Sequence, residues 1–202
     1  MQDKVLYHLG HPPKEDDVLQ DLYAKLVCHL YEDRVLDAIF FTKVPESMVP
    51  LRKLYFWNNT ELGMNIKRVD FPVYGLDDPV LEKKCSDLDK KVKSILQQEL
   101  KKTIESKSPR RIRAQSEKSI KLKGDDFQSF SKKLSPMMLE YKQTLQKRLE
   151  HIVDHANSVA RLMDYSKILV VCDMEHSSEI QELAEKYGYE YARVRLPSLE
   201  KD

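Results

Sequence analysis

The chain has 202 residues and a mass of 23.7 kDa, enough for one well-filled domain or for a domain with a small appendage. Its 34 lysines and arginines against 33 aspartates and glutamates give a net charge of +1, which excludes a uniformly basic nucleic-acid binder and an acidic solvating chain. Three widely spaced cysteines, no signal peptide and no long apolar run predict a soluble, cytoplasmic protein without a disulfide framework, a zinc ribbon or a membrane span.

The first eighty residues alternate between strand and helix patterns. An apolar run at 4–9 predicts a strand, and apolar residues at spacings of three and four predict a helix over 15–30. Two more strands are expected at 35–41 and 66–71, each stopped by a proline, with a helix over 49–62 between them. This order predicts parallel strands joined by crossover helices.

Residues 78–165 have the character of a charged helical insertion or cap. We expect amphipathic helices over 78–107 and 136–163, the second starting after a proline. Between them, 101–123 carries nine lysines or arginines against two glutamates, which predicts a solvated, flexible basic loop. A nucleic-acid site there is disfavoured, because no aromatic residue is interleaved and acidic residues elsewhere offset the charge.

The α/β pattern returns near the end of the chain. Four consecutive apolar residues and a cysteine in Lys167–Cys172 predict a strand that is buried on both faces. A helix over 179–187, capped by Ser177 or Ser178, and a final strand at 189–196 are expected to follow.

Together these elements predict an α/β fold with a mostly parallel sheet of about five strands, flanking helices and a charged helical insertion. Residues 1–77 and 166–202 supply the two halves of the α/β part, and 78–165 the insertion, in one compact domain overall.

Polar residues that follow the predicted strands are the candidates for a site, because ligands of parallel sheets bind beyond the carboxyl ends of the strands. They are His11, Glu46, Asp70, Asp173 and His176, with Thr42 and Lys43 also following the second strand. A histidine or carboxylate among them could act as the general base of a hydrolytic reaction. His176, Asp173 and His11 are also candidate ligands of a divalent metal ion. Each has an ordinary alternative: Asp173 would cap the next helix, and Asp70 would fix a turn.

Three further histidines have structural interpretations. His8 lies within the first strand and is expected to be half-buried and hydrogen-bonded. His151 and His155 are four residues apart, which places them on one helix face and could suit zinc. Because no H-E-x-x-H pattern accompanies them, a polar helix surface is favoured. No glycine-rich phosphate-binding motif occurs in the sequence.

Several short pieces occur in an order that suggests a family. They are Leu9-Gly10-His11, Arg52 with Val69-Asp70-Phe71-Pro72, a late helix through Arg148 and Arg161, and Ile168–Cys172 followed by His176. This arrangement resembles the TraB and erythromycin-esterase-like superfamily. The chain departs from that pattern at Asp173, where the family has a glycine three residues before the last histidine, and at His11, which directly follows its glycine.

The resemblance implies a hydrolase-like α/β fold in which histidines and carboxylates activate water, with a divalent metal as a further option. The departures leave open a non-catalytic member. The alternative function is an interaction or scaffold module that binds a protein partner through the helices at 78–107 and 136–163, with the basic loop as a tether.

Overall fold

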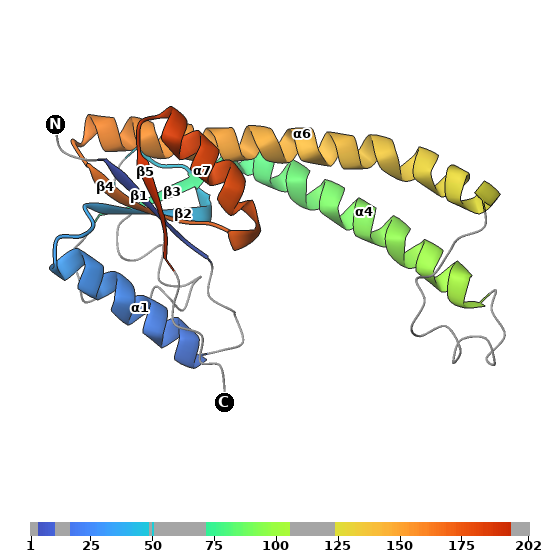
Figure 1. Ribbon diagram of the computed structural model, residues 1–202, viewed down its shortest axis with the longest axis horizontal. Helices are drawn as coiled ribbons and strands as arrows, with labels where there is room; N and C mark the ends of the chain where they lie inside the picture. The colour runs from blue at the N-terminus through green and yellow to red at the C-terminus, as the bar shows by residue number, and fades with distance from the viewer. Residues whose placement is uncertain (1–3, 11–16, 49, 51–71, 106–123, 195–202) are drawn as a thin grey trace. The chain divides into compact units, whose positions relative to one another are not determined.

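The computed structural model describes residues 4–10, 17–48, 50, 72–105 and 124–194 (Figure 1). In chain order its elements are β1 (Val5–Leu9), α1 (Asp17–Glu32), β2 (Ala38–Pro45), β3 (Val73–Asp77), α4 (Pro79–Glu105), α6 (Gly124–Leu162), β4 (Lys167–Val171), the 3-10 helix η1 (Met174–His176), α7 (Ser177–Lys186) and β5 (Glu190–Arg193).

The chain divides into two compact units. The sheet unit comprises Met1–Pro79 and Arg148–Asp202, and the hairpin unit comprises Val80–Lys147. The boundary at Lys147 falls inside α6, so the last part of this helix belongs to the sheet unit. The inserted unit therefore begins two residues after the start expected for the helical insertion and ends well before residue 165.

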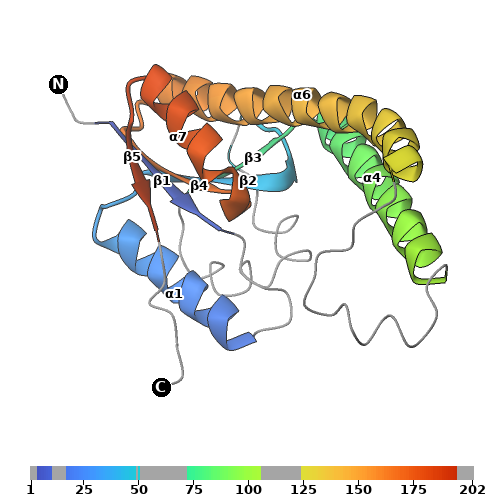
Figure 2. The same ribbon diagram turned by 45° about the vertical axis from the view of Figure 1, so that its right-hand side comes forward.

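The sheet unit contains a five-stranded, all-parallel sheet in the order β3-β2-β4-β1-β5, which confirms the predicted α/β fold. The connection from β1 to β2 runs through α1, and the connection from β4 to β5 runs in the opposite direction through α7. Figures 1 and 2 show α1 on one face of the sheet and α7, with the end of α6, on the other. Right-handed crossovers that run in opposite directions require opposite faces.

Alternating side chains of the strands build a core on each face of the sheet. On the α1 face, Leu9, Ile39, Phe41 and Leu169 pack with Val27 of the helix. The other strand positions, including Leu6, Phe40, Ile168 and Val170, are fully buried, as are Ile152 and Ala156 of α6 and Ile180 of α7. A strand such as β4 is buried on both faces, and its apolar run in the sequence follows from this.

The third strand differs from the sequence expectation. The predicted strand at 66–71 lies outside the described residues, and β3 is Val73–Asp77, which the sequence analysis did not identify. Gly75 sits in the middle of β3 because a Cβ atom there would collide with the carbonyl oxygen of Pro45. Pro45 is itself the last residue of β2, beside a register irregularity in the pairing with β3.

Helix ends also differ from the expectation. α6 starts at Gly124 and carries Pro136 inside it, although the sequence placed the start after this proline. α4 extends to Glu105, so the first residues of the expected basic loop are helical, while 106–123 lies outside the described residues. Ser177 does not cap α7, because its hydroxyl donates to the carbonyl of Met174 and His176 occupies the N-cap position.

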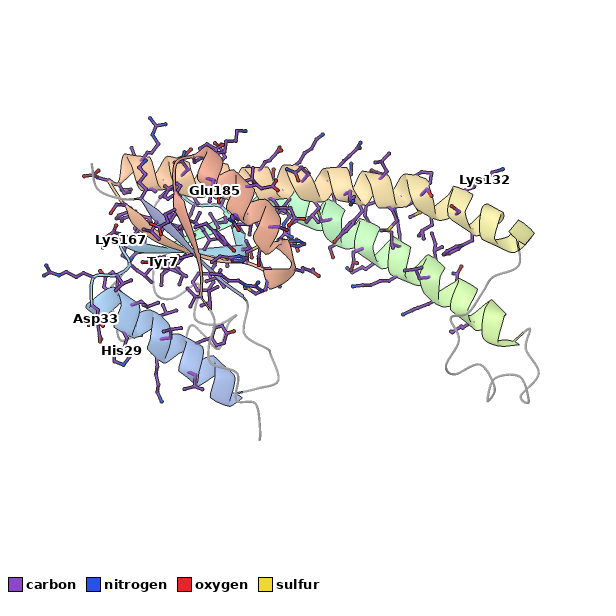
Figure 3. The ribbon with its side chains drawn as sticks, viewed as in Figure 1. Tyr7, His29, Asp33, Lys132, Lys167 and Glu185 are labelled. Atoms are coloured by element: carbon purple, nitrogen blue, oxygen red, sulfur yellow. The ribbon has the colours of Figure 1, made fainter. Side chains whose placement is uncertain are left out.

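The hairpin unit consists of α4 and the first part of α6, which run in opposite directions (Figures 1 and 2). Lys84 Nζ of α4 lies 3.0 Å from Glu140 Oε1 of α6 and links the two helices. Lys132 of α6 is exposed, and Figure 3 labels it in the N-terminal part of this helix. Among the helices that the structure describes, none combines the length and apolarity needed to cross a bilayer.

Candidate functional site

The carboxyl ends of β1 and β4 lie side by side, and the chain leaves them toward opposite faces of the sheet. Such a switch point opens a crevice between the outgoing loops in doubly wound sheets. Gly10 after β1 is buried there, and a Cβ atom on it would collide with Met174 in the loop after β4. The two loops therefore approach each other closely at this glycine.

Four charged residues form a continuous chain of contacts at this edge of the sheet, and we refer to Lys43, Asp77, Arg148 and Asp173 as the carboxyl-edge site. Arg148 donates from Nε to Asp77 Oδ1 and from Nη2 to Asp77 Oδ2, both at 2.7 Å. The backbone N–H of Lys43 donates to the same Asp77 carboxylate. Lys43 Nζ lies 3.1 Å from Asp173 Oδ1. The charges alternate in sign from Arg148 to Asp173.

The two ends of this chain differ in their access to solvent. The side chains of Asp77 and Arg148 are only 3 % and 13 % exposed, whereas those of Asp173 and Lys43 are 37 % and 51 % exposed. A buried ion pair is held by its own hydrogen bonds, while an exposed pair contributes little to stability. The inner pair is thus structural, and the outer pair is accessible to a ligand.

Lys43 adopts a left-handed backbone conformation with φ of 66°. This conformation costs a non-glycine residue about 1–2 kcal/mol and is found mostly where surrounding contacts enforce it. Here the Asp77 carboxylate binds the Lys43 N–H, and the neighbouring Thr42 hydroxyl donates to the carbonyl of Val171 at 3.0 Å. The end of β2 is therefore fixed on both sides, by β3 and by β4, with the lysine side chain placed at Asp173.

His8 at the end of β1 is completely buried and held at both ring nitrogens. Its Nε2 lies 3.2 Å from the carbonyl oxygen of Cys172, and its Nδ1 lies 2.8 Å from the hydroxyl of Tyr191. Because a carbonyl only accepts, Nε2 carries the proton and Nδ1 of the neutral ring accepts from Tyr191. Burial lowers the pKa of His8 below 6.5, against the raising effect of the Cys172 carbonyl. His8 is therefore a neutral structural residue, more deeply buried than the sequence predicted.

Cys172 follows β4 directly and lies within the same region. Its thiol is buried, and burial together with the Asp173 carboxylate raises the pKa to about 12. The thiolate is the nucleophilic form of cysteine. Cys172 is therefore not a nucleophile near neutral pH, although it lies beside the exposed pair.

His176 ends η1 and is almost fully buried. Its backbone N–H donates to the carbonyl of Asp173 at 3.1 Å, and its Nε2 lies 3.8 Å from Glu175 Oε1. Asp173 occupies the N-cap position of η1 without a capping hydrogen bond from its side chain. The capping alternative for Asp173 is thus excluded, and its carboxylate contacts Lys43 instead.

Glu46 lies at a second cluster, against α6. Its Oε2 is 2.7 Å from His151 Nε2 and 3.7 Å from His155 Nδ1, although the shorter contact lacks the direction of a hydrogen bond. His155 Nε2 lies 3.1 Å from the carbonyl of Ser47, and the two imidazoles stack at 6.0 Å. These histidines contact the segment after β2, and His155 is more buried than the expected polar helix surface.

The sequence-predicted residues separate into groups. Asp173 and His176 share one loop, and Glu46 is engaged with the histidines of α6. His11 and Asp70 lie outside the described residues. Across the ranges that the structure describes, no three histidine, cysteine or carboxylate residues form a group that could hold a metal ion. With His11 outside those ranges, the expected donors His176 and Asp173 do not make a metal site by themselves.

The sequence analysis missed the inner half of the carboxyl-edge site. Asp77 ends a strand that was not predicted, and Arg148 was noted only as part of a helix. The available signal was Asp77 itself, a carboxylate after the short apolar run Val73–Leu76.

No protein-family model matches the chain, and neither the curated proteins nor the solved structures contain a match.

Proposed function

We propose that the protein is a hydrolase-like α/β protein that acts on a substrate carrying an anionic group at the carboxyl-edge site. The observation that carries this proposal is the accessible Lys43–Asp173 pair, 3.1 Å apart, beside the switch point of a parallel sheet. A cation and a carboxylate at such a position supply the two functions that hydrolysis needs, charge stabilisation and proton transfer.

The ion pair itself suggests how the site responds to its substrate. An anionic group of the substrate competes with Asp173 for the ammonium of Lys43. The released carboxylate accepts a proton from water, and the water oxygen attacks the scissile carbonyl or phosphoryl centre. His176, in the same loop, is the candidate to protonate the leaving group; Asp173 then releases the proton taken from water to the solvent, and His176 takes up a proton from the solvent.

The buried Asp77–Arg148 pair has a positioning role in this proposal. Asp77 holds the backbone of Lys43, and Arg148 neutralises Asp77 and fixes it with two hydrogen bonds. A group that takes part in the reaction lowers the activation barrier more effectively when neighbouring groups that do not react hold it in position beforehand. The expectation of a TraB-like hydrolase belongs to the same proposal, supported by the place of Arg148 and His176 in the chain.

Two chromogenic esters that each carry an anionic group, p-nitrophenyl hemisuccinate and p-nitrophenyl phosphate, test this function on the purified chain. We expect turnover of at least one, and a loss of about 100-fold or more in Asp173→Asn, the range for removal of a general base. Glu182→Gln, an exposed carboxylate of α7, is the matched control and should keep the wild-type rate. Equal rates in Asp173→Asn and wild type, or no turnover of either ester, contradict the proposal.

The second candidate function is a non-catalytic interaction module that binds a partner protein, here a second copy of this chain. An open groove of about 440 Å³ on α6 favours it, lined by Phe130, Leu134, Met138 and Leu139 with Ser131, Ser135 and Lys142. Met138 and Leu139 are 40 % and 58 % exposed. Light scattering over a range of concentrations tests self-association through this groove, and Leu134→Asp should abolish it.

We also propose that the protein acts in the cytoplasm. Its three cysteines, Cys28, Cys85 and Cys172, form no disulfide bond with one another, which suits a reducing compartment.

A further inference from the structure

The two units of the chain carry opposite charges. The hairpin unit, Val80–Lys147, has eighteen lysines and arginines against nine aspartates and glutamates, a net charge of +9. The rest of the chain has sixteen against twenty-four, a net charge of −8. The near-neutral total, which disfavoured a nucleic-acid partner at the sequence level, is thus the sum of a basic and an acidic unit. Such a charge distribution attracts polyanions to one part of the chain.

An exposed row of lysines follows one face of α4. Lys83, Lys90 and Lys101 are exposed, and at 100° per residue they fall within about 20° of one line along the helix. From first to last they span about 27 Å at 1.5 Å per residue. Asp87 lies beside this row and offsets part of its charge. The opposite face of α4 carries its buried residues, Cys85, Leu88 and Val92.

The lysines of the row are distinct from those that hold the helices together. Lys84 pairs with Glu140 on α6, and Lys93 pairs with Asp89 one turn earlier on α4. Both of these pairs lie to the sides of the row, as the helical spacing requires. The exposed face of α4 opposite its buried residues therefore carries lysines other than the two that form these ion pairs.

We propose that the lysine row of α4 binds the phosphate backbone of double-stranded nucleic acid without reading its sequence. A duplex carries one charge per about 1.7 Å, so it presents about sixteen phosphates along the 27 Å of the row. Lysine is depleted in protein–protein interfaces, whereas interfaces with nucleic acids are strongly positive. The segment 80–126 contains no aromatic residue, so it offers no platform for stacking single-stranded bases.

The test measures fluorescence anisotropy of a labelled 30-base-pair duplex DNA of mixed sequence with the full chain at several KCl concentrations. We expect log K to fall with log[KCl] with a slope of about −3 or steeper, as several phosphate contacts require. The variant Lys83→Gln/Lys90→Gln/Lys101→Gln should bind at least tenfold more weakly and with a slope that is shallower by about 2 to 3.

A control variant that removes the same number of positive charges elsewhere tests whether the effect is specific to the lysine row. Lys25→Gln/Arg161→Gln/Lys186→Gln changes three exposed cations of the sheet unit and should bind within twofold of wild type. Circular dichroism confirms that both variants are folded. The proposal is overturned by an absence of binding at 25 mM KCl, by equal losses in both triple variants, or by an unaffected row variant. Displacement of the duplex by poly-L-glutamate as readily as by unlabelled duplex also overturns it, in favour of an acidic protein. None of these results depends on hydrolytic activity.

Discussion

Asp77 and Arg148 join the two points at which the chain leaves and re-enters the sheet unit. Asp77 is the last residue of β3, two residues before α4 begins at Pro79. Arg148 is the first residue of the sheet unit after the hairpin unit. Their two hydrogen bonds of 2.7 Å fasten the end of β3 to α6 within the sheet unit. The same carboxylate holds Lys43, so one buried pair supports both the end of β3 and the candidate site.

Removal of one partner from this pair should strongly destabilise the sheet unit. Arg148→Met leaves the Asp77 carboxylate, 3 % exposed, without its cation, and such a loss typically costs about 3–5 kcal/mol. Urea unfolding measures the difference. Lys93→Met, which breaks an exposed pair with Asp89, is the control and should cost less than about 1 kcal/mol. A change below 1 kcal/mol in Arg148→Met would show that the pair does not support the fold.

The left-handed backbone of Lys43 predicts an unusual order among substitutions. Lys43→Gly relieves the strain at φ of 66°, whereas Lys43→Ala keeps it, and both remove the exposed pair with Asp173. We expect the glycine variant to be more stable than the alanine variant by about 1 kcal/mol. Thermal or urea unfolding compares the two. An alanine variant as stable as the glycine variant would argue against strain at this position.

Burial of His8 predicts a loss of stability in mild acid. Because its pKa is lowered in the folded state, the unfolded chain binds this proton more readily. The contribution of His8 to the free energy of unfolding is complete above pH 6.5 and falls as the pH drops below it. Urea unfolding between pH 7.5 and pH 5 should show a shallower fall in His8→Gln than in wild type.

His29 provides the control for this measurement. Its side chain is 75 % exposed, so His29→Gln should retain the wild-type pH dependence. The same fall in His8→Gln as in wild type would mean that His8 is not a buried neutral group.

The cysteines should differ in their reaction with a thiol reagent in the folded protein. Cys28 is partly exposed, whereas Cys85 and Cys172 are buried, and burial raises the pKa of Cys172 to about 12. With Ellman's reagent at pH 8 we expect slow modification of Cys28 and protection of the other two until the chain unfolds. Cys28→Ser should then show almost no early reaction. Rapid modification of Cys172 in the folded protein would contradict its burial.

Much of the sheet could be predicted from the sequence because its strands carry their own patterns. β1 and β4 appear as short apolar runs, and α1 as a regular apolar stripe. β3 could not be predicted in the same way. Its five residues follow a proline and include Gly75, and both features are typical of loops unless the close approach of Pro45 is known.

The candidate site was only half predictable for a related reason. Asp173 was identified because strand ends carry ligand-binding residues, and the structure gives it a cationic partner. That partner is 130 residues away in the chain, and Arg148 is 71 residues from Asp77. Local sequence patterns do not reveal such distant pairs. The Lys43–Asp173 pair arises only when the pairing of β2 with β4 brings their ends together, and the Asp77–Arg148 pair only when α6 lies against the end of β3.

The charge of each unit could not be predicted for a similar reason. The net charge of the whole chain follows from the sequence, but the charge of each unit depends on the boundaries at Pro79 and Lys147. The sequence alone already shows the basic stretch at 101–123, and the division adds that the rest of the chain is acidic as a separate unit.

A double-mutant cycle on Lys43 and Asp173 tests the central claim most directly. It compares kcat/KM of wild type, Lys43→Met, Asp173→Asn and the double variant on the ester that the wild type hydrolyses. If the two residues act as one unit, each single change lowers kcat/KM by about 100-fold or more, and the double change costs little beyond the larger single loss. Losses that multiply in the double variant, or a wild-type rate in Asp173→Asn, would contradict the account.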